Sequence, residues 1–251
     1  MLTGNRNPLL IYLPLALLFF GSCGLEDYPY IYPVPQSSIT QEMNYRATVR
    51  IPSNNSSTTF THFVIFYRIY VSDVLDASTT RDSYTAINPL LASDYNAILP
   101  YIDSDTLVNT NMDTLFSNRN YKYLYLENYN IDSELDSSVL GSTLIFDFSS
   151  SKVPTVTIGG TEFVLWRSNG NGAYTPHPHR YFINSSDLYR SDYINENTNA
   201  DVVNKSGITA ADPHYTYAAM FIAAVGIDVG SYSYIYSTPS LIHVFLLPDQ
   251  W

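Results

Sequence analysis

The one cysteine of this chain, Cys23, is the residue whose type and position point most directly to chemistry. A thiol is a nucleophile, so a cysteine near the start of a chain can carry a diacylglycerol group, and the amine freed by cleavage before it can carry a further acyl chain. A single cysteine cannot form a disulfide within the chain, and it excludes a structural zinc site of the multi-cysteine kind. Cys23 therefore needs an explanation of its own.

The sequence before Cys23 is typical of a removable signal peptide. Residues 1–8 contain Arg6 and the initiator amine, and residues 9–20 (LLIYLPLALLFF) form an apolar run. This run is shorter than the ~20 apolar residues of a comfortable membrane-spanning helix. We therefore expect cleavage between Ser22 and Cys23, which removes residues 1–22 as a signal peptide.

The four residues that end at this cysteine, Phe20-Gly21-Ser22-Cys23, resemble the lipobox of bacterial lipoproteins. Phe stands where Leu is usual in that motif, and Gly where Ala or Ser is usual, a relaxation that resembles spirochaete-type lipoproteins. The resemblance implies palmitate-type acylation of Cys23 and attachment to a membrane through this lipid. Two or three chains anchor stably, because each buried methylene contributes about 0.8 kcal/mol. The alternatives are an ordinary cleaved signal with an incidental cysteine and a retained membrane helix.

The residue after the cysteine bears on location. It is Gly24, and not the Asp that in some bacteria resembles an inner-membrane retention signal. We therefore expect a protein of the cell envelope, outside the cytoplasm, with the outer membrane or cell surface favoured over the inner membrane.

Two histidines, His177 and His179, are the most suggestive pair of metal ligands. Residues two apart in an extended chain face the same side, so both imidazoles could bind one metal ion, with Asp187 or His214 completing the site. Such a site would support an extracytoplasmic metal-assisted hydrolase, which is the alternative function. Two ligands in a loop bind metal weakly, so we favour a proline-rich surface loop and expect no metal and no cofactor.

Carboxylate-rich segments offer no stronger candidate. The Asp and Asn residues of 103–113 lack the central glycine and the terminal glutamate of a calcium-binding EF-hand loop. Glu134 and Asp136 could form a pair, but a solvated acidic loop is the default. The chain has no Gly-Xaa-Ser-Xaa-Gly elbow and no phosphate loop. We therefore expect no catalytic residues, and a protein that is not an enzyme.

Tyrosine is unusually frequent, with 23 Tyr against 2 Trp. Its side chain gives a large contact area and one hydrogen-bonding tip at a small entropic cost, which is why binding loops use it. We predict that Tyr232, Tyr234 and Tyr236, in a loop between the last two strands, bind a protein or glycan partner. The alternative is that these tyrosines pack against the rim of the domain.

The charge balance limits the partners further. The formal net charge is −11, and only 14% of the residues are charged. An acidic surface repels phosphate backbones, so we expect no binding to nucleic acid. The balance also argues against a basic patch as the membrane anchor.

Stretches rich in aromatic and β-branched residues predict a mainly β fold. Residues 60–71 (FTHFVIFYRIYV) are apolar on one face and partly apolar on the other at a period of two, which suits the middle of a sandwich sheet. Residues 153–167 predict a hairpin that turns at Gly159 and Gly160. Other strands are predicted at 42–51, 121–127, 142–148, 216–228 and 240–247.

Little helix is expected. The best candidate is Asn96–Ile102, with Ser93 able to cap its start and Pro100 able to end it. Residues 23–38 contain several prolines, which favour an extended, Pro- and Tyr-rich tether that carries the lipid. A single domain is then expected over residues 39–251.

Two segments resemble parts of fibronectin type III domains. Residues 67–70 (YRIY) resemble the central strand of that family, and residues 222–226 (IAAVG), followed by a loop and an apolar strand, resemble its last two strands. The tryptophan of an early strand is missing, and Tyr217 stands one position from the usual tyrosine. The resemblance implies a fibronectin III/immunoglobulin-like antiparallel sandwich with a long insertion at about 76–155, because such sandwiches have ~100 residues. It implies a fold and no chemistry.

These observations lead to one expectation of function. We expect a membrane-anchored cell-envelope lipoprotein with a binding or structural role and no catalysis.

Acylation of Cys23 can be tested directly. Cells that express the chain and grow on an alkyne fatty acid should yield a labelled protein, because the thiol carries the acyl groups. The Cys23→Ala variant should carry no label. Equal labelling of the two proteins would show that the lipid lies elsewhere.

Overall fold

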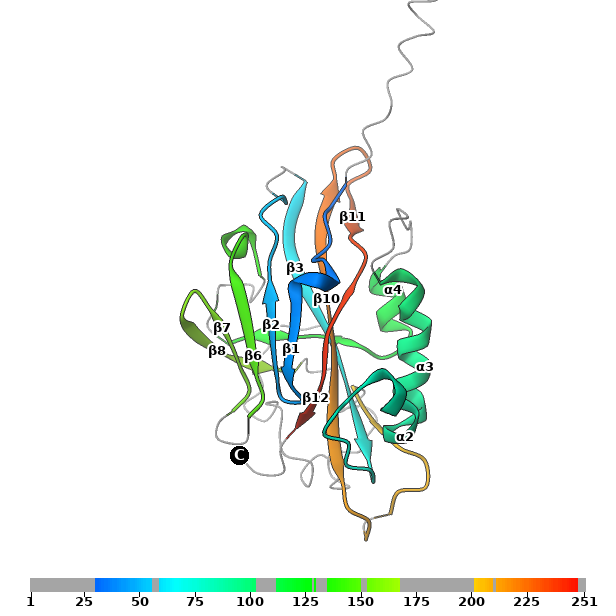
Figure 1. Ribbon diagram of the computed structural model, residues 1–251. Coiled ribbons are helices and arrows are strands. Elements are labelled where there is room, and N and C mark those ends of the chain that lie inside the picture. Colours follow the sequence, from blue (N-terminus) through cyan, green and yellow to red (C-terminus); the bar gives the residue numbers. More distant parts are fainter. Residues whose placement is uncertain are drawn as a thin grey trace, which may run out of the picture. The chain divides into compact units, whose positions relative to one another are not determined.

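Two long strands, β3 (Phe60–Ser72) and β10 (Tyr215–Asp228), lie side by side through the middle of the protein in a computed structural model (Figure 1). They pair antiparallel, with Ile65 opposite Ile222 and Ile69 opposite Ala218. Nearly every side chain of both strands is buried, on both faces of the ladder. Both faces therefore need a cover.

The structure describes residues 30–55, 59–102, 112–127, 129, 135–149, 153–167, 201–209 and 211–247. From Ile31 onward the chain forms a single unit.

The sheet around the two central strands is completed by four short partners. On β10, β12 (Ser240–Leu247) pairs with the first half of the strand and β11 (Ser233–Tyr236) with its end. On the other side, β4 (Lys122–Tyr123) pairs antiparallel with β3, and β9 (Val202–Asn204) pairs parallel with it. The parallel pairing of β9 departs from an otherwise antiparallel fold.

A second sheet covers one face of the central ladder. Its strand order is β1-β2-β6-β7-β8-β5, and all neighbours are antiparallel. The bounds are β1 (Ile39–Met43), β2 (Arg46–Arg50), β5 (Tyr125–Leu126), β6 (Thr143–Asp147), β7 (Thr155–Ile158) and β8 (Thr161–Trp166). Gly159 and Gly160 turn the β7–β8 hairpin with φ of +58° and +87°, a conformation that glycine adopts at low cost. The predicted hairpin is therefore confirmed.

Short helices cover the other face: α2 (Tyr84–Ile87), α3 (Pro89–Ile98) and α4 (Met112–Ser117) (Figure 1). The helix expected at Asn96–Ile102 instead begins at Pro89. Asn88 caps it, because its side chain accepts a hydrogen bond from the Leu90 N–H, and proline suits the first helical position. Single 3-10 turns lie at Gln36–Ser38, Arg81–Ser83, Leu99–Tyr101 and Ser137–Val139. None of the helices in the described ranges is long and apolar enough to span a bilayer.

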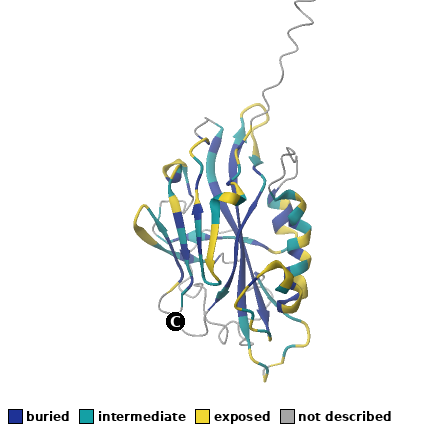
Figure 2. Cartoon of the chain, in the orientation of Figure 1, coloured by how far each residue is buried: buried dark blue, intermediate teal, exposed yellow. Residues whose placement is uncertain are grey.

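The result is a mainly β sandwich, as predicted. The placement of helices against one of its outer faces was not predicted. The core between the sheets includes Ile69, Met220 and Phe146. The core under the helices includes Phe66 and Phe116, whose rings stack with centroids 4.1 Å apart. Figure 2 shows the central strands buried along most of their length and the exposed residues at the periphery.

Three strand assignments differ from the sequence prediction. Residues 121–127 are not one strand, because Lys122–Tyr123 pair with β3 as β4 and Tyr125–Leu126 pair with β8 in the other sheet as β5. Residues 42–51 are not one strand, because the chain turns at Asn44 and Tyr45 between β1 and β2, and Asn favours turns through its own hydrogen-bonding side chain. Residues 233–236, predicted as a loop, form β11. They do so because β10 extends beyond the end of β12 and leaves its last residues without a partner on that edge.

The domain starts earlier than predicted. Ile31 and Val34 are buried, and the Gln36 side-chain amide bonds both the N–H and the carbonyl oxygen of Leu241. The prolines keep this segment extended, which lets its apolar side chains reach the core. The expectation of a tether over 23–38 is therefore wrong from Ile31 onward.

The prediction of an insertion at about 76–155 is also wrong in part. These residues supply the three helices, but they also supply β6, which lies between β2 and β7 in the second sheet. The stretch is therefore part of the sandwich itself.

The central ladder can be tested by truncation. Ile69 is fully buried, so Ile69→Ala should cost about 2–5 kcal/mol of unfolding free energy through lost apolar contact and a cavity. Tyr234 is 65% exposed, so Tyr234→Ala should cost under about 0.5 kcal/mol. Urea melts of the two variants give the comparison, and a larger loss for Tyr234→Ala would contradict this architecture.

Candidate functional site

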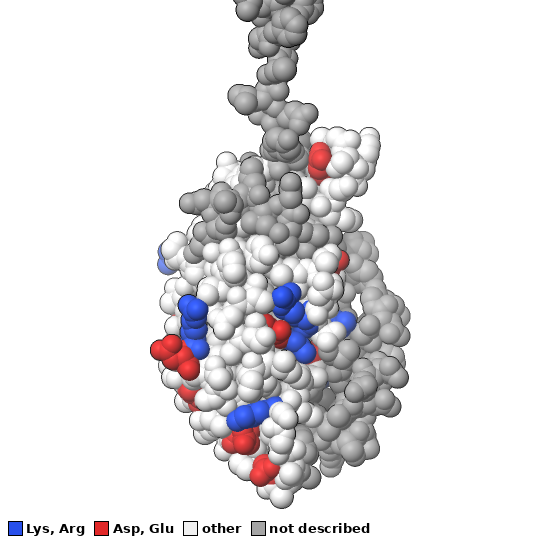
Figure 3. Space-filling view, turned by 90° about the vertical axis from the view of Figure 1, so that its right-hand side faces the viewer, with Lys and Arg blue, Asp and Glu red and all other residues white. Residues whose placement is uncertain are grey.

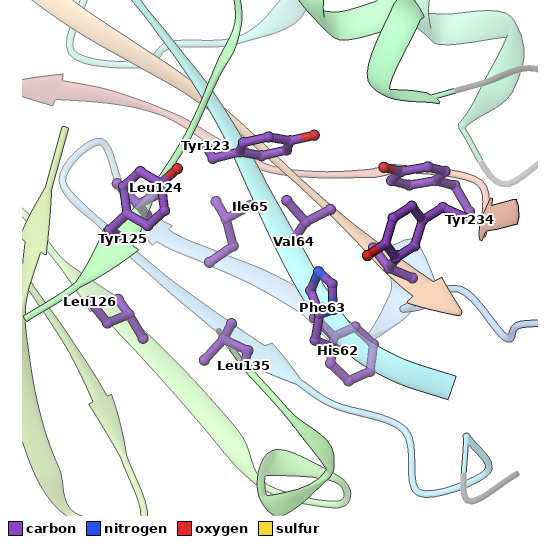
Figure 4. Close-up of a pocket in the computed structure, with 12 residues that line it drawn as sticks. His62, Phe63, Val64, Ile65, Tyr123, Leu124, Tyr125, Leu126, Leu135 and Tyr234 are labelled. Atoms are coloured by element: carbon purple, nitrogen blue, oxygen red, sulfur yellow. The ribbon is translucent and has the colours of Figure 1, made fainter. Parts of the chain in front are cut away.

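A cavity of about 190 Å³ opens beside the first half of β3 (Figure 4). Its walls come from four places: the start of β3, the segment that runs from β4 into β5, Leu135, and the β10–β11 hairpin. The lining residues are His62, Phe63, Val64, Ile65, Tyr123, Leu124, Tyr125, Leu126, Leu135, Val225, Tyr234 and Tyr236.

The cavity exists because β4 follows β3 only briefly. After pairing with Phe66 and Tyr67, the chain leaves the edge of β3, with a last hydrogen bond from the Leu124 N–H to the Ile65 carbonyl oxygen at 2.9 Å. It then joins β8 in the other sheet as β5. Closer to the start of β3, the Phe63 N–H bonds the carbonyl oxygen of Leu135 at 2.8 Å. The pocket lies between Leu124 and Leu135, the two residues that bond this edge of β3.

The pocket combines an apolar floor with a phenolic rim. Ile65, Leu126 and Leu135 supply aliphatic surface. In Figure 4 the Tyr123 ring lies above Ile65, and the Tyr234 ring lies across β3 from Leu126 and Leu135. His62 adds an imidazole to the wall, and burial lowers its pKa, which favours the neutral ring. Such a lining suits a group that has an apolar face and a hydrogen-bonding edge.

A chain of hydrogen bonds fixes the rim. The Tyr123 hydroxyl donates to Asp113 Oδ1 at 2.5 Å, and Tyr236 hydrogen-bonds Tyr123. Burial raises the pKa of Tyr123, and so do the hydrogen bond and the charge of Asp113. Burial and the same carboxylate raise the pKa of Tyr236. Both rings are therefore neutral phenols at ordinary pH, and α4, which carries Asp113, sets their positions.

The tyrosines named from the sequence divide between two places. Tyr234 and Tyr236 line the pocket, whereas Tyr232 is 87% exposed in the turn between β10 and β11 and is no lining residue. Sequence reasoning missed Tyr123 and His62. The alternation of tyrosines in residues 121–125 was a visible signal for Tyr123, but His62 looked like any strand residue.

Several other candidates lie outside the described residues, namely Ser22, Cys23, His177, His179 and Asp187.

The remaining candidates have structural contacts. His214 Nε2 lies 3.1 Å from the Thr209 carbonyl oxygen, and Asp136 caps a 3-10 turn by accepting from the Ser138 N–H. Another histidine, His243 of β12, is buried with Nε2 2.9 Å from the Met43 carbonyl oxygen, and its burial lowers its pKa to about 4. Within the described ranges no three His, Cys, Asp or Glu residues gather as a metal site.

A buried ion pair between Arg167 and Asp201 lies against β3 at Tyr67. Arg167 contacts Asp201 twice, at 2.8 Å through Nε and 2.7 Å through Nη2, and the Tyr67 hydroxyl donates to the same carboxylate. Burial alone would raise the pKa of Asp201, but the charge and hydrogen bonds of Arg167 outweigh it and lower this pKa. All donors point to one carboxylate and no lining residue of the pocket takes part, so this cluster stabilises the fold.

Comparisons of the chain with protein-family models, with curated proteins and with solved structures returned no match.

The Arg167–Asp201 ion pair should contribute to the free energy of unfolding because both of its partners are buried. Asp201→Ala leaves the Arg167 charge buried and unpaired, and should cost about 3–5 kcal/mol of unfolding free energy in a urea melt. The matched control is Asp73→Ala, which removes an ion pair to Lys205 of similar length, 2.6 Å, at an exposed position. Its effect should be small, since solvent screens that pair. Similar losses in the two variants would mean that burial does not decide the contribution.

Proposed function

We propose that this chain is a lipid-anchored protein of the cell envelope that binds a partner through the tyrosine-lined pocket beside β3. The lipid anchor rests on the signal-like start and the unique Cys23. The binding role rests on one observation: two tyrosines singled out from the sequence line a pocket whose floor is apolar and whose rim is fixed by Asp113.

The size of the pocket indicates the kind of ligand. At about 190 Å³ it is smaller than the ~300–1,000 Å³ of pockets for drug-sized molecules. It therefore fits one side chain or one sugar ring of a larger partner. Binding of that kind depends on a few central anchors, and tyrosine is frequent among them. A peptide or glycan with an exposed ring meets these requirements.

The strand order supports the proposed likeness to fibronectin type III and immunoglobulin domains. In such sandwiches strands C, F and G share one sheet, and strands A, B and E share the other. Here β3, β10 and β12 are neighbours in one sheet, and β1, β2 and β6 in the other. Sandwiches of this kind serve many functions, so the proposal of binding rests on the pocket.

A photo-crosslinking side chain can find an unknown partner. Benzoyl-phenylalanine in place of Tyr234 keeps an aromatic ring at the pocket, so irradiation of cells should give a covalent adduct of the lipidated protein. Protease or glycosidase digestion of the adduct then separates a peptide partner from a glycan.

The matched control places the same crosslinker at Leu75, an exposed apolar residue beyond the other end of β3. Its adducts report on random collisions. We expect the Tyr234 adduct to be absent from the Leu75 variant. The same products at both positions, or none at Tyr234, would overturn the binding role of the pocket.

A further inference from the structure

The turn between β10 and β11 carries two exposed large apolar side chains. Val229 is 65% exposed and Tyr232 is 87% exposed, the largest exposure among the large apolar residues of the described chain. Gly, Pro, Asn, Asp and Ser dominate turns, because they allow positive φ, fix φ or hydrogen-bond their own backbone. Val229 and Tyr232 lie three positions apart at the tip of one hairpin, which distinguishes them from apolar side chains scattered singly over a surface.

The backbone of this turn holds the aromatic ring outward at some cost. Tyr232 has φ of +55°, a left-handed conformation that bulky residues rarely adopt. The Asp228 carboxylate accepts from the Gly230 N–H and from the Ser231 hydroxyl, and the Tyr232 N–H bonds the Asp228 carbonyl oxygen at 2.7 Å. Glycine or asparagine would suit this position better, so tyrosine here is not explained by the turn.

The described domain begins next to the same hairpin. Ile31 packs directly on Gly226, so closely that a Cβ atom there would lie 2.5 Å from Ile31 Cδ1. Asn55 fixes the following residue through two hydrogen bonds to the Tyr32 backbone. The position from which the chain runs back toward Cys23 is therefore fixed, two residues from the start of the turn at Asp228.

The distance to the lipid is short. Between Cys23 and Ile31 the chain spans at most about 29 Å even when fully extended, at ~3.6 Å per residue. An anchored Cys23 therefore keeps Ile31, and the hairpin beside it, close to the membrane surface. In Figure 1 the β10–β11 turn is the uppermost described part, and in Figure 3 the uppermost part is largely uncharged with some acidic atoms.

We propose that the β10–β11 turn rests in the membrane interface, with Tyr232 and Val229 as the contacting side chains, an inference that depends on the proposed lipid anchor. Tyrosine is enriched at membrane–water interfaces, where its ring meets the acyl boundary and its hydroxyl meets the headgroups. The lipid holds the protein on the membrane, and the turn sets the orientation of the domain. Asp228 disfavours an anionic surface, so the fitting lipids are zwitterionic.

Site-directed spin labelling of the lipidated full mature chain tests this contact. Cys23 is the one cysteine and its thiol carries lipid, so Tyr232→Cys introduces a single free thiol for a nitroxide. In phosphatidylcholine–phosphatidylethanolamine vesicles, we expect this label to gain accessibility to dissolved oxygen and to lose accessibility to a water-soluble nickel chelate. Val229→Cys provides a second label in the same turn. Leu75→Cys, beyond the far end of β3, should show no change.

The outcomes separate this inference from the proposed anchor. If mass spectrometry shows no acyl chains on the purified chain, the anchor fails and the inference fails with it. An acylated protein whose labels at 229 and 232 stay as accessible to the chelate as the label at 75 would overturn the membrane contact alone. Loss of chelate access without a gain in oxygen access would show burial of the turn against a second copy of the chain, and would overturn the membrane contact too.

A stability measurement guards against misfolding. Tyr232→Asn relieves the left-handed strain and removes the ring, so its melting temperature should equal or exceed that of the wild type. With a label at Val229→Cys in the same chain, the gain in oxygen access should shrink. An unchanged gain would mean that Tyr232 does not contribute to the contact.

Discussion

The structure depends on one constraint: the β3–β10 ladder is apolar on both faces. In β10, Met220 and Ile222 face one side while Phe221 and Val225 face the other. A two-layer sandwich would leave one of these faces in water. The helices between β3 and β4 remove that exposed area, and alanines at 218, 219, 223 and 224 let both covers approach the ladder closely. The third layer is thus a requirement of the central strands.

The edge of β3 that does not face β10 places a second constraint on the fold. Each backbone group along it needs a partner, and no single strand supplies them all. β4, Leu124, Leu135, Asp201 and β9 each take a part of the edge. Between Leu124, which bonds Ile65, and Leu135, which bonds Phe63, no strand of the described chain continues along this edge. The tyrosine-lined pocket occupies that place, so its position follows from how the edge is shared.

The sequence predicts single strands and turns better than it predicts which of these elements pair with one another. The two-sided pattern of residues 60–71 and the glycine pair at 159–160 give a strand and a hairpin, because these signals are local. β11 escaped prediction because it forms on an edge that β12 leaves free, which depends on the lengths of three strands. Tyr234 and Tyr236 were recognised by composition. Their joining with Tyr123 and Asp113 was not predictable, since it needs the fold of α4 over the sheet.

The short helices show a related limit. Ser93 and Pro100 suggested a helix at 96–102, but Asn88 and Pro89 form a better start, and the buried side chains of Leu91 and Ile98 hold the result. Where two capping signals are close together, the helix forms at the one that also allows apolar residues to be buried.

The Arg167–Asp201 pair has an implication for how this chain can change over generations. The two residues lie on either side of residues 168–200, and their bonds bring the two ends of that segment to one point beside Tyr67. Loss of either partner alone would leave a buried charge unpaired. Over generations we therefore expect Arg167 and Asp201 to be kept or exchanged together, because a change at one position alone destabilises the sandwich.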